Sequence, residues 1–151
     1  MTTFELIQIL SGTVGAFFFS ILFNIRGKRL ALSTVGGFLS WSSYVLFEEL
    51  TGSEAWSYFL VAAFITLYAE VMARIAKSPT TTFIMASLVP LIPGASLYYT
   101  MRYALGSDFS LFSEKALYTL ELAAALALGV IVATAVTKIA FGLVGKYRAK
   151  K

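Results

Sequence analysis

The stretch from Leu88 to Tyr98 reads LVPLIPGASLY and places two prolines and a glycine inside an apolar segment long enough to span a bilayer. Pro90 and Pro93 have no backbone N–H, so two carbonyls one turn earlier lose their helical donors. Lipid offers no replacement hydrogen bond, and such a segment must face protein or a water-filled cavity. We predict a transmembrane helix that is broken between Pro90 and Gly94.

The rest of the chain is also apolar. Of its 151 residues, 58% are hydrophobic and only 13% are charged, a balance typical of an integral membrane protein. A helix needs roughly 20 apolar residues to cross the hydrocarbon core. We predict one all-α transmembrane domain over residues 1–151, a bundle of five helices at about 4–25, 30–49, 55–76, 79–104 and 115–143.

The loops alternate in charge, which predicts the orientation. Lys and Arg are retained on the cytoplasmic side of a membrane. The loops after the first and third spans and the tail are basic, whereas the loop after the second span carries only Glu48, Glu49 and Glu54. We therefore expect the N-terminus outside, the C-terminus in the cytoplasm, and a multi-pass location in the cytoplasmic (inner) membrane. The first span exceeds a signal-peptide core, so we expect it to stay in the mature protein.

Several kinds of chemistry are excluded by composition. The sequence has no cysteine and no histidine, so it offers no disulfide, no thiolate or imidazole metal site and no Ser/His or Cys/His catalysis. We expect no metal, no cofactor and no enzymatic activity. The net charge of +4 is explained by the basic loops facing the cytoplasm, so nucleic-acid binding is an unnecessary inference.

The break itself is the candidate binding site. The second half-helix could aim the N–H groups of Gly94, Ala95 and Ser96 at a carboxylate near the membrane midplane, aided by the helix dipole. The carbonyls freed by the prolines, those of Ala86 and Val89, could receive an ammonium group or a cation. The alternative is a simple proline kink whose carbonyls are satisfied by neighbouring helices.

An acidic residue also lies inside the third span. A charged Glu70 has a high free energy inside the bilayer unless it is paired, protonated or hydrated. Arg74 follows four residues later and can pair with it in the favourable Glu-to-Arg order. The sequence leaves two interpretations open, a structural ion pair or a proton-coupling carboxylate. Glu121 in the fifth span poses the same choice with weaker support.

Small residues recur four apart in several spans, most regularly as Ala125, Gly129, Ala133 and Thr137 in the fifth. Such spacing lets helix backbones approach closely. These seams either pack the helices of this chain or, on the fifth span, receive another subunit. Five helices are few for a complete secondary transporter, whose folds usually comprise two related halves, so a partner or a homo-oligomer is implied.

Trp41 lies deeper in its span than the tryptophan and tyrosines of the interfacial belts. It stands among the hydroxyl side chains of Ser40, Ser42 and Ser43. Core packing and a place in the lining of an interior cavity are both compatible with this position.

The run from Tyr68 to Tyr98, YAEVMARIAKSPTTTFIMASLVPLIPGASLY, resembles the small subunit of the split-type threonine/serine exporters, the ThrE-like family. The P-x-x-P-G-x-x-x-Y signature of that family falls on Pro90, Pro93, Gly94 and Tyr98. The A-E-x-x-A-R pattern and the loop proline fall on Ala69, Glu70, Ala73, Arg74 and Pro79. Phe23-Asn24-Ile25 also resembles the family's turn before the basic loop.

The resemblance implies an exporter of small polar metabolites, threonine and serine or a dicarboxylate, driven by the proton motive force. It also implies a larger membrane subunit as partner, alongside the lipid bilayer and the small-molecule substrate. On this hypothesis Pro90, Pro93, Gly94, Ala95, Ser96 and Tyr98 bind the substrate. Glu70 would carry a proton under the control of Arg74.

Two other functions compete with export. A non-transporting scaffold would only stabilise a larger membrane protein and would need no polar groups at midplane depth. A membrane enzyme would have to rely on Glu48, Glu49 and Glu54, which more simply form a solvated loop. A channel is not supported, because no recognisable selectivity filter is present.

Overall fold

The computed structural model describes the backbone of residues 3–106 and 109–148 and the side chains of these residues up to 141. Within these ranges every regular element is helical: α1 (Thr3–Leu22), α2 (Lys28–Thr51), α3 (Glu54–Ala76), α4 (Thr80–Leu88), the 3₁₀ turn η1 (Val89–Leu91), α5 (Gly94–Leu105) and α6 (Phe109–Arg148). The basic side chains of the predicted cytoplasmic tail, from Lys146 to Lys151, lie outside the described part.

The prediction of an all-α bundle with a broken fourth span is confirmed. α1, α2, α3 and α6 are each long and apolar enough to cross a membrane, and the pair Thr80–Leu91 and Gly94–Leu105 passes the same test with a bend of 60°. These helices overlap the five ranges predicted from the sequence. The orientation in the membrane stays a prediction.

Short turns set the helix boundaries. Gly52 ends α2 in the left-handed conformation with φ of 62°, a backbone that glycine adopts without steric cost, and its N–H donates to the Glu48 carbonyl. Lys77 ends α3 in the same conformation, with φ of 48°. Pro79 stands just before α4, where its missing N–H costs no helical hydrogen bond.

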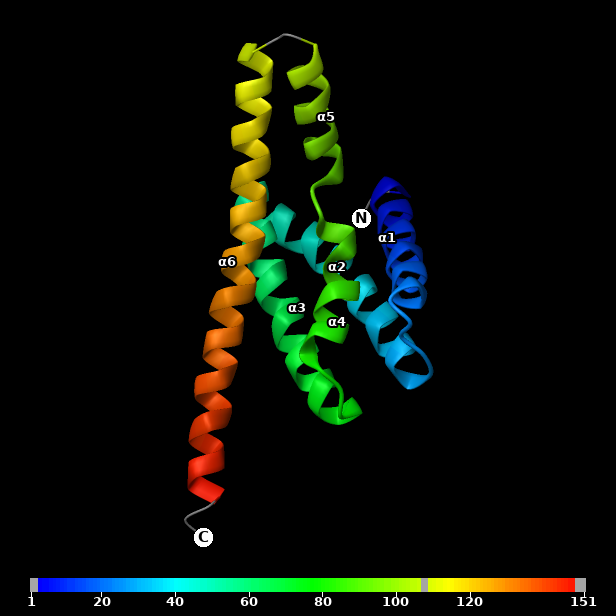
Figure 1. Cartoon of the computed structure of the whole chain (residues 1–151), viewed down its shortest axis with the longest axis vertical. Coiled ribbons are helices and arrows are strands. Elements are labelled where there is room, and N and C mark those ends of the chain that lie inside the picture. Colours follow the sequence, from blue (N-terminus) through cyan, green and yellow to red (C-terminus); the bar gives the residue numbers. More distant parts are fainter. Residues whose placement is uncertain (1–2, 107–108, 149–151) are drawn as a thin grey trace.

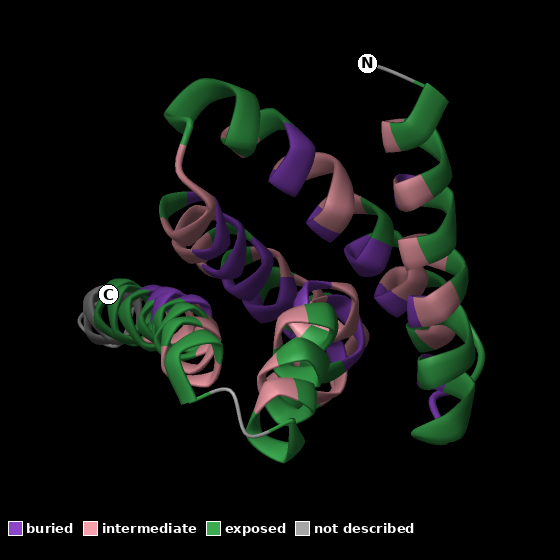
Figure 2. Ribbon diagram, turned by 90° about the horizontal axis from the view of Figure 1, so that it is seen from above, coloured by how far each residue is buried: buried purple, intermediate pink, exposed green. Residues whose placement is uncertain are grey.

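α3 is the central helix. It packs against α2, α4 and α6, and its buried face includes Val61, Ile65 and Thr66. Figure 2 shows buried residues gathered on the inner helices and exposed residues on the outward faces of α1 and α6. Apolar side chains on those outward faces are what a lipid-covered surface requires.

The small residues of α6 pack against α3. Ala125, Ala133 and Thr137 are buried, and a Cβ atom added to Gly129 would collide with the carbonyl oxygen of Phe59. This seam therefore joins two helices of the same chain. The alternative, that it receives another subunit, is wrong for this stretch of α6 because α3 already occupies it.

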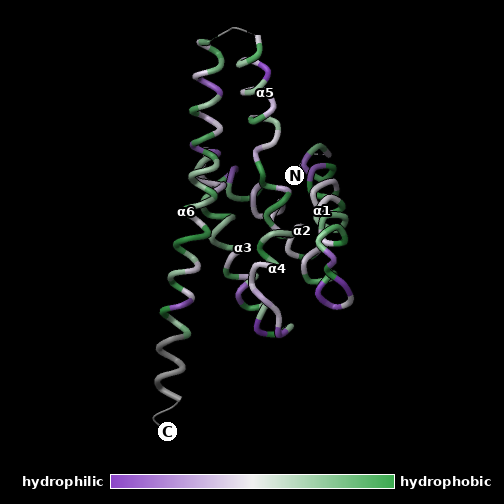
Figure 3. Tube along the Cα trace, in the orientation of Figure 1, coloured by the Kyte–Doolittle hydropathy of each residue, from purple (hydrophilic) through white to green (hydrophobic). Residues whose placement is uncertain are grey.

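The two basic loops lie at the same end of the bundle. In Figure 3 the α1–α2 loop and the α3–α4 loop are hydrophilic and both stand opposite the α2–α3 loop. This common end is the one that the excess of Lys and Arg predicts to face the cytoplasm.

α5 and the first turns of α6 form a hairpin that extends beyond the α2–α3 end of the bundle (Figure 1). α5 has 12 residues and is about 18 Å long, and none of them is buried. Among the described residues α6 begins at Phe109, six residues before the predicted start of the fifth span at about residue 115. Ser113 lies inside this helix and its hydroxyl donates to the Ser110 carbonyl.

Candidate functional site

The break in the fourth span is a tight turn of the backbone. After η1, Ile92 is extended, with φ of −61° and ψ of 123°, and Pro93 precedes the first residue of α5. The N–H of Ile92 donates to the Val89 carbonyl at 3.2 Å, and the N–H of Gly94 donates to the Ile92 carbonyl at 2.6 Å. The two proline positions thus end one helix and let the next begin in a new direction.

The Val89 carbonyl accepts the hydrogen bond from Ile92, and neither Val89 nor Ala86 lines the pocket described below. Their role as acceptors for an ammonium group or a cation stays a prediction. The N–H of Gly94 is likewise engaged. Among the described residues no acceptor is recorded for the N–H groups of Ala95 and Ser96. The first turn of α5 therefore retains two donors for an anion.

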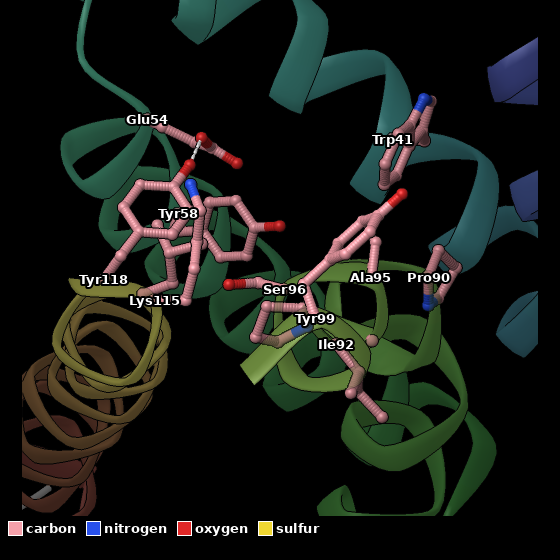
Figure 4. Close-up of a pocket in the computed structure, with 13 residues that line it drawn as sticks. Trp41, Glu54, Tyr58, Pro90, Ile92, Ala95, Ser96, Tyr99, Lys115 and Tyr118 are labelled. Carbon is pink, nitrogen blue, oxygen red and sulfur yellow. Dashed lines mark hydrogen bonds between the residues drawn. The ribbon is translucent and has the colours of Figure 1, made fainter. Parts of the chain in front are cut away.

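An open pocket of about 330 Å³ lies at the break (Figure 4). Its walls come from four helices and the turn between α4 and α5. They comprise Trp41 of α2, Glu54 and Tyr58 of α3, Pro90, Ile92, Pro93, Gly94, Ala95, Ser96 and Tyr99 of the broken span, and Lys115, Tyr118 and Leu122 of α6. Because the first residue of α3 lines it, the pocket lies near the α2–α3 end of the bundle.

Five of the six predicted binding residues, Pro90 to Ser96, line this pocket, and Tyr98 does not. The Tyr98 side chain is exposed, and its ring packs edge-on against that of Tyr99 with centroids 5.5 Å apart. Successive helical residues point about 100° apart, so Tyr99 faces the pocket while Tyr98 points away. The phenol that α5 contributes to the pocket is therefore that of Tyr99, one position after the predicted Tyr98.

Both signs of charge meet in the pocket, a feature that the sequence-based interpretation missed. Glu54 was assigned to a solvated loop, but its carboxylate faces the pocket and accepts a hydrogen bond from the Tyr118 hydroxyl (Figure 4). Lys115 of α6 also lines the pocket, where its ammonium group lies 5.7 Å from the centroid of the Tyr118 ring and 3.8 Å from a carboxylate oxygen of Glu114. The sequence shows an acid at the start of one span and a lysine near the start of another. It does not show that α3 packs against α6, and this packing brings the two charges together.

Hydroxyl groups join α5 to α6 beside the pocket. The Ser96 and Thr119 hydroxyl oxygens are 2.5 Å apart, and Thr119 donates its own proton to the Lys115 carbonyl at 2.7 Å. Ser96 must then be the donor to Thr119. The Ser96 oxygen keeps its lone pairs and is left as an acceptor at the pocket wall.

Trp41 has both of the roles left open by its position. Its ring packs against Tyr44 with centroids 5.1 Å apart, and Tyr44 in turn contacts Tyr58. The same side chain lines the pocket. Its indole nitrogen is buried without a hydrogen-bond partner among the described residues.

Glu70 and Arg74 form the predicted ion pair away from the pocket. The Oε2 atom of Glu70 lies 2.6 Å from Nη1 of Arg74, which also donates to the Glu70 carbonyl at 2.6 Å. Glu70 is buried in the bundle. It is 16 residues beyond Glu54 on α3, which corresponds to about 24 Å along the helix axis. The ion pair and the pocket are thus two separate polar sites.

Glu121 lies in neither of these sites. It lines a shallow groove between α3 and α6 whose other walls include Trp56, Phe59 and Leu128. Glu121 therefore does not line the pocket that contains Glu54 and Lys115.

The fold and this site define a multi-pass membrane protein with a broken span and a polar pocket at the break, an arrangement typical of membrane transporters. Residues 8–150 match the family described as Threonine/Serine exporter, ThrE. The chain therefore belongs to the threonine/serine exporter family, which assigns it to transporters rather than enzymes. No curated protein and no solved structure matches it.

Proposed function

We propose that the chain is the small subunit of a two-component secondary exporter in the cytoplasmic membrane. It moves small polar metabolites, threonine and serine foremost, out of the cell at the expense of the proton motive force. Family membership supports export of this kind. The observation that carries the proposal is the meeting of Glu54, Lys115 and the first turn of α5 in one pocket.

These groups match the charges of an α-amino acid. The ammonium group of Lys115 and the N–H groups of Ala95 and Ser96 suit the substrate carboxylate. The Glu54 carboxylate suits the substrate ammonium group, and the acceptor oxygen of Ser96 suits an ammonium or a side-chain hydroxyl. A dicarboxylate would meet repulsion from Glu54, so the pocket favours amino acids over dicarboxylates.

We propose a second subunit because this chain has too few spans for a complete transporter. Transporter folds usually comprise two related halves around a central site, and this chain has five spans. The pocket is open on one side, and α5 has no buried residue. A larger membrane subunit of the same family would close the pocket and cover α5.

We also propose how export is coupled to proton movement. Glu70 is the buried acid of α3, and Arg74 pairs with it. A proton that binds Glu70 would release Arg74 and loosen the link between the two side chains. Because Glu70 is remote from the pocket, the coupling acts through movement of the helices.

Export assays on whole cells test the pocket. Glu54→Gln removes the acid without changing its shape, and we expect it to lower threonine and serine export at least about tenfold, the loss of one charge-assisted contact. The matched control is Glu49→Gln, which changes an exposed acid outside the pocket and leaves export intact. Equal export by the two variants at equal protein level would contradict the proposed site.

A second pair of variants tests the carboxylate side. Lys115→Gln should weaken export of amino acids and dicarboxylates alike, because both carry a carboxylate. Lys77→Gln, at an exposed position in the α3–α4 turn, is the control. If Lys115→Gln and Lys77→Gln behave alike, Lys115 does not contact the substrate.

A further inference from the structure

Three fully buried serine residues in the bundle have hydroxyls without a hydrogen-bond partner among the described residues. They are Ser33 and Ser40 of α2 and Ser87 of α4. Other buried hydroxyls in this chain behave differently, since Ser20 and Thr66 donate to the carbonyl one turn earlier at 2.7 Å. A buried hydroxyl in an apolar bundle costs free energy unless it has a polar partner, so these three hydroxyls are suited to meet water or a polar solute.

The three serines share one junction between helices, which we call the serine seam (Ser33, Ser40 and Ser87). Ser33 and Ser40 are two helical turns apart and lie on the same face of α2. Between them, Gly36 faces Ser87 of α4 so closely that an added Cβ would collide with its hydroxyl. Gly37 faces Ala16 of α1 in the same way. The seam is therefore the line where α1, α2 and α4 meet.

One end of the serine seam reaches the pocket. Trp41 follows Ser40 in the chain, and Pro90 lies three residues after Ser87; both line the pocket. Gly12 of α1 lies beside them, since a Cβ built on it would stand 3.4 Å from that of Pro90 and 3.5 Å from that of Trp41.

The other end approaches the basic loops. Ser33 is five residues from Lys28, the first residue of α2, which is about 8 Å along the helix. The seam thus runs from the pocket to the end of the bundle that carries the α1–α2 and α3–α4 loops. A further unpaired hydroxyl on α2 belongs to Ser42, which is nine residues from Ser33 and so lies on the opposite face of the helix.

We propose that the serine seam is the route by which a small polar solute, with its water, passes between the pocket and the basic end of the bundle. α4 is only nine residues long and ends at the break, so it can separate from α1 and α2 without unfolding a long helix. When it does, the three hydroxyls gain water or the polar groups of the solute as partners. The proposal rests on the proposed function, because it assigns the path of that exporter's substrate.

Cysteine labelling tests the route directly, because the native chain has no cysteine. Ser33→Cys, Ser40→Cys and Ser87→Cys each change one atom. The full chain is expressed in cells. Right-side-out and inside-out membrane vesicles from these cells are then treated with the membrane-impermeant thiol reagent MTSES. Thr66→Cys is the matched control, since Thr66 is equally buried on α3 but its hydroxyl is bonded within its own helix.

We expect the three seam cysteines to react at least tenfold faster than Thr66→Cys when the basic end of the bundle faces the reagent, and saturating threonine to slow the reaction several-fold. Reaction no faster than that of Thr66→Cys, with and without a proton gradient, would overturn the route. Export by the Ser33→Ala, Ser40→Ala and Ser87→Ala variants is a second test, which applies even if the cysteine variants do not fold. Lowered export at normal protein level supports the route, and unchanged export of all three overturns it.

The two proposals fail in different ways. Reactive seam cysteines in a chain that exports no amino acid would support a hydrated route and would overturn the proposed substrate. Amino-acid export with unreactive seam cysteines would leave the exporter function standing and would overturn the route.

Discussion

The guanidinium carbon of Arg74 lies 3.6 Å from the centroid of the Phe141 ring, which ties the last turn of α3 to α6. The same guanidinium holds Glu70, so one side chain links an acid on α3 to an aromatic ring 67 residues later than Arg74 in the chain. A cation over an aromatic face is stabilised by the ring quadrupole. Protonation of Glu70 would therefore change an interhelical contact as well as a local one.

Glu70→Gln separates the two interpretations of this pair. Glutamine still accepts a hydrogen bond from Arg74 but cannot carry a proton. If Glu70 is the coupling acid, export driven by a proton gradient falls at least about tenfold while exchange of substrate across the membrane without net proton movement continues. Glu121→Gln, which changes an acid in another groove, should leave both activities intact. Normal gradient-driven export by Glu70→Gln would assign the pair a structural role only.

Ser96→Ala removes an acceptor from the pocket wall. The lost contact to a charged substrate group is worth about 1.5–3 kcal/mol, so the substrate concentration for half-maximal export should rise about tenfold or more. Thr119→Val removes the partner of Ser96 on α6 but leaves Ser96 in place. A larger effect of Ser96→Ala than of Thr119→Val indicates contact with substrate. Equal effects would mean that the hydroxyls only hold α5 to α6.

Gly36→Ala tests the close packing of α2 on α4. The added methyl group would meet Ser87 and lie 3.1 Å from Cε1 of Tyr68, so we expect overpacking to destabilise the chain by about 1–3 kcal/mol. Gly15→Ala is the control, because nothing lies within 4 Å of its added Cβ and alanine favours helices. Thermal unfolding in detergent compares the two. A Gly36→Ala chain as stable as Gly15→Ala would show that the two helices are loosely packed.

The two tryptophans of the chain report on different surfaces. Trp41 lines the pocket, whereas Trp56 is exposed in the groove between α3 and α6. In the Trp56→Phe chain, saturating threonine should change the fluorescence of Trp41 because it alters the polarity around the indole. The Trp41→Phe chain should give no such change. A response confined to Trp56 would assign binding to the groove instead of the pocket.

Much of the fold follows from the sequence because its physical causes are local. Span length, apolar composition and the two prolines predict the helices and the break, and each depends on residues within a few turns. The boundary at Phe109 was missed because Ser113 and Glu114 have the local pattern of a helix start. Tertiary packing of α6 against α5 instead continues the helix through them.

The site was predictable only in part, for the same reason. Pro93, Gly94 and Ser96 define it through the backbone, which the sequence reveals. Glu54 and Lys115 are 61 residues apart and enter the pocket only because α3 packs against α6. A periodic pattern says which residues share a face of one helix, but it does not say which faces of two helices meet.

The 60° bend between α4 and α5 has a mechanical consequence. One wall of the pocket, at Pro90, belongs to the segment that rests on α2 and α3, and another, at Ser96, belongs to the segment fastened to α6. The broken span therefore has the geometry of a hinge. A rotation of α5 about the break by a few degrees would widen or narrow the mouth of the cavity and would leave the hydrogen bonds within each helix intact.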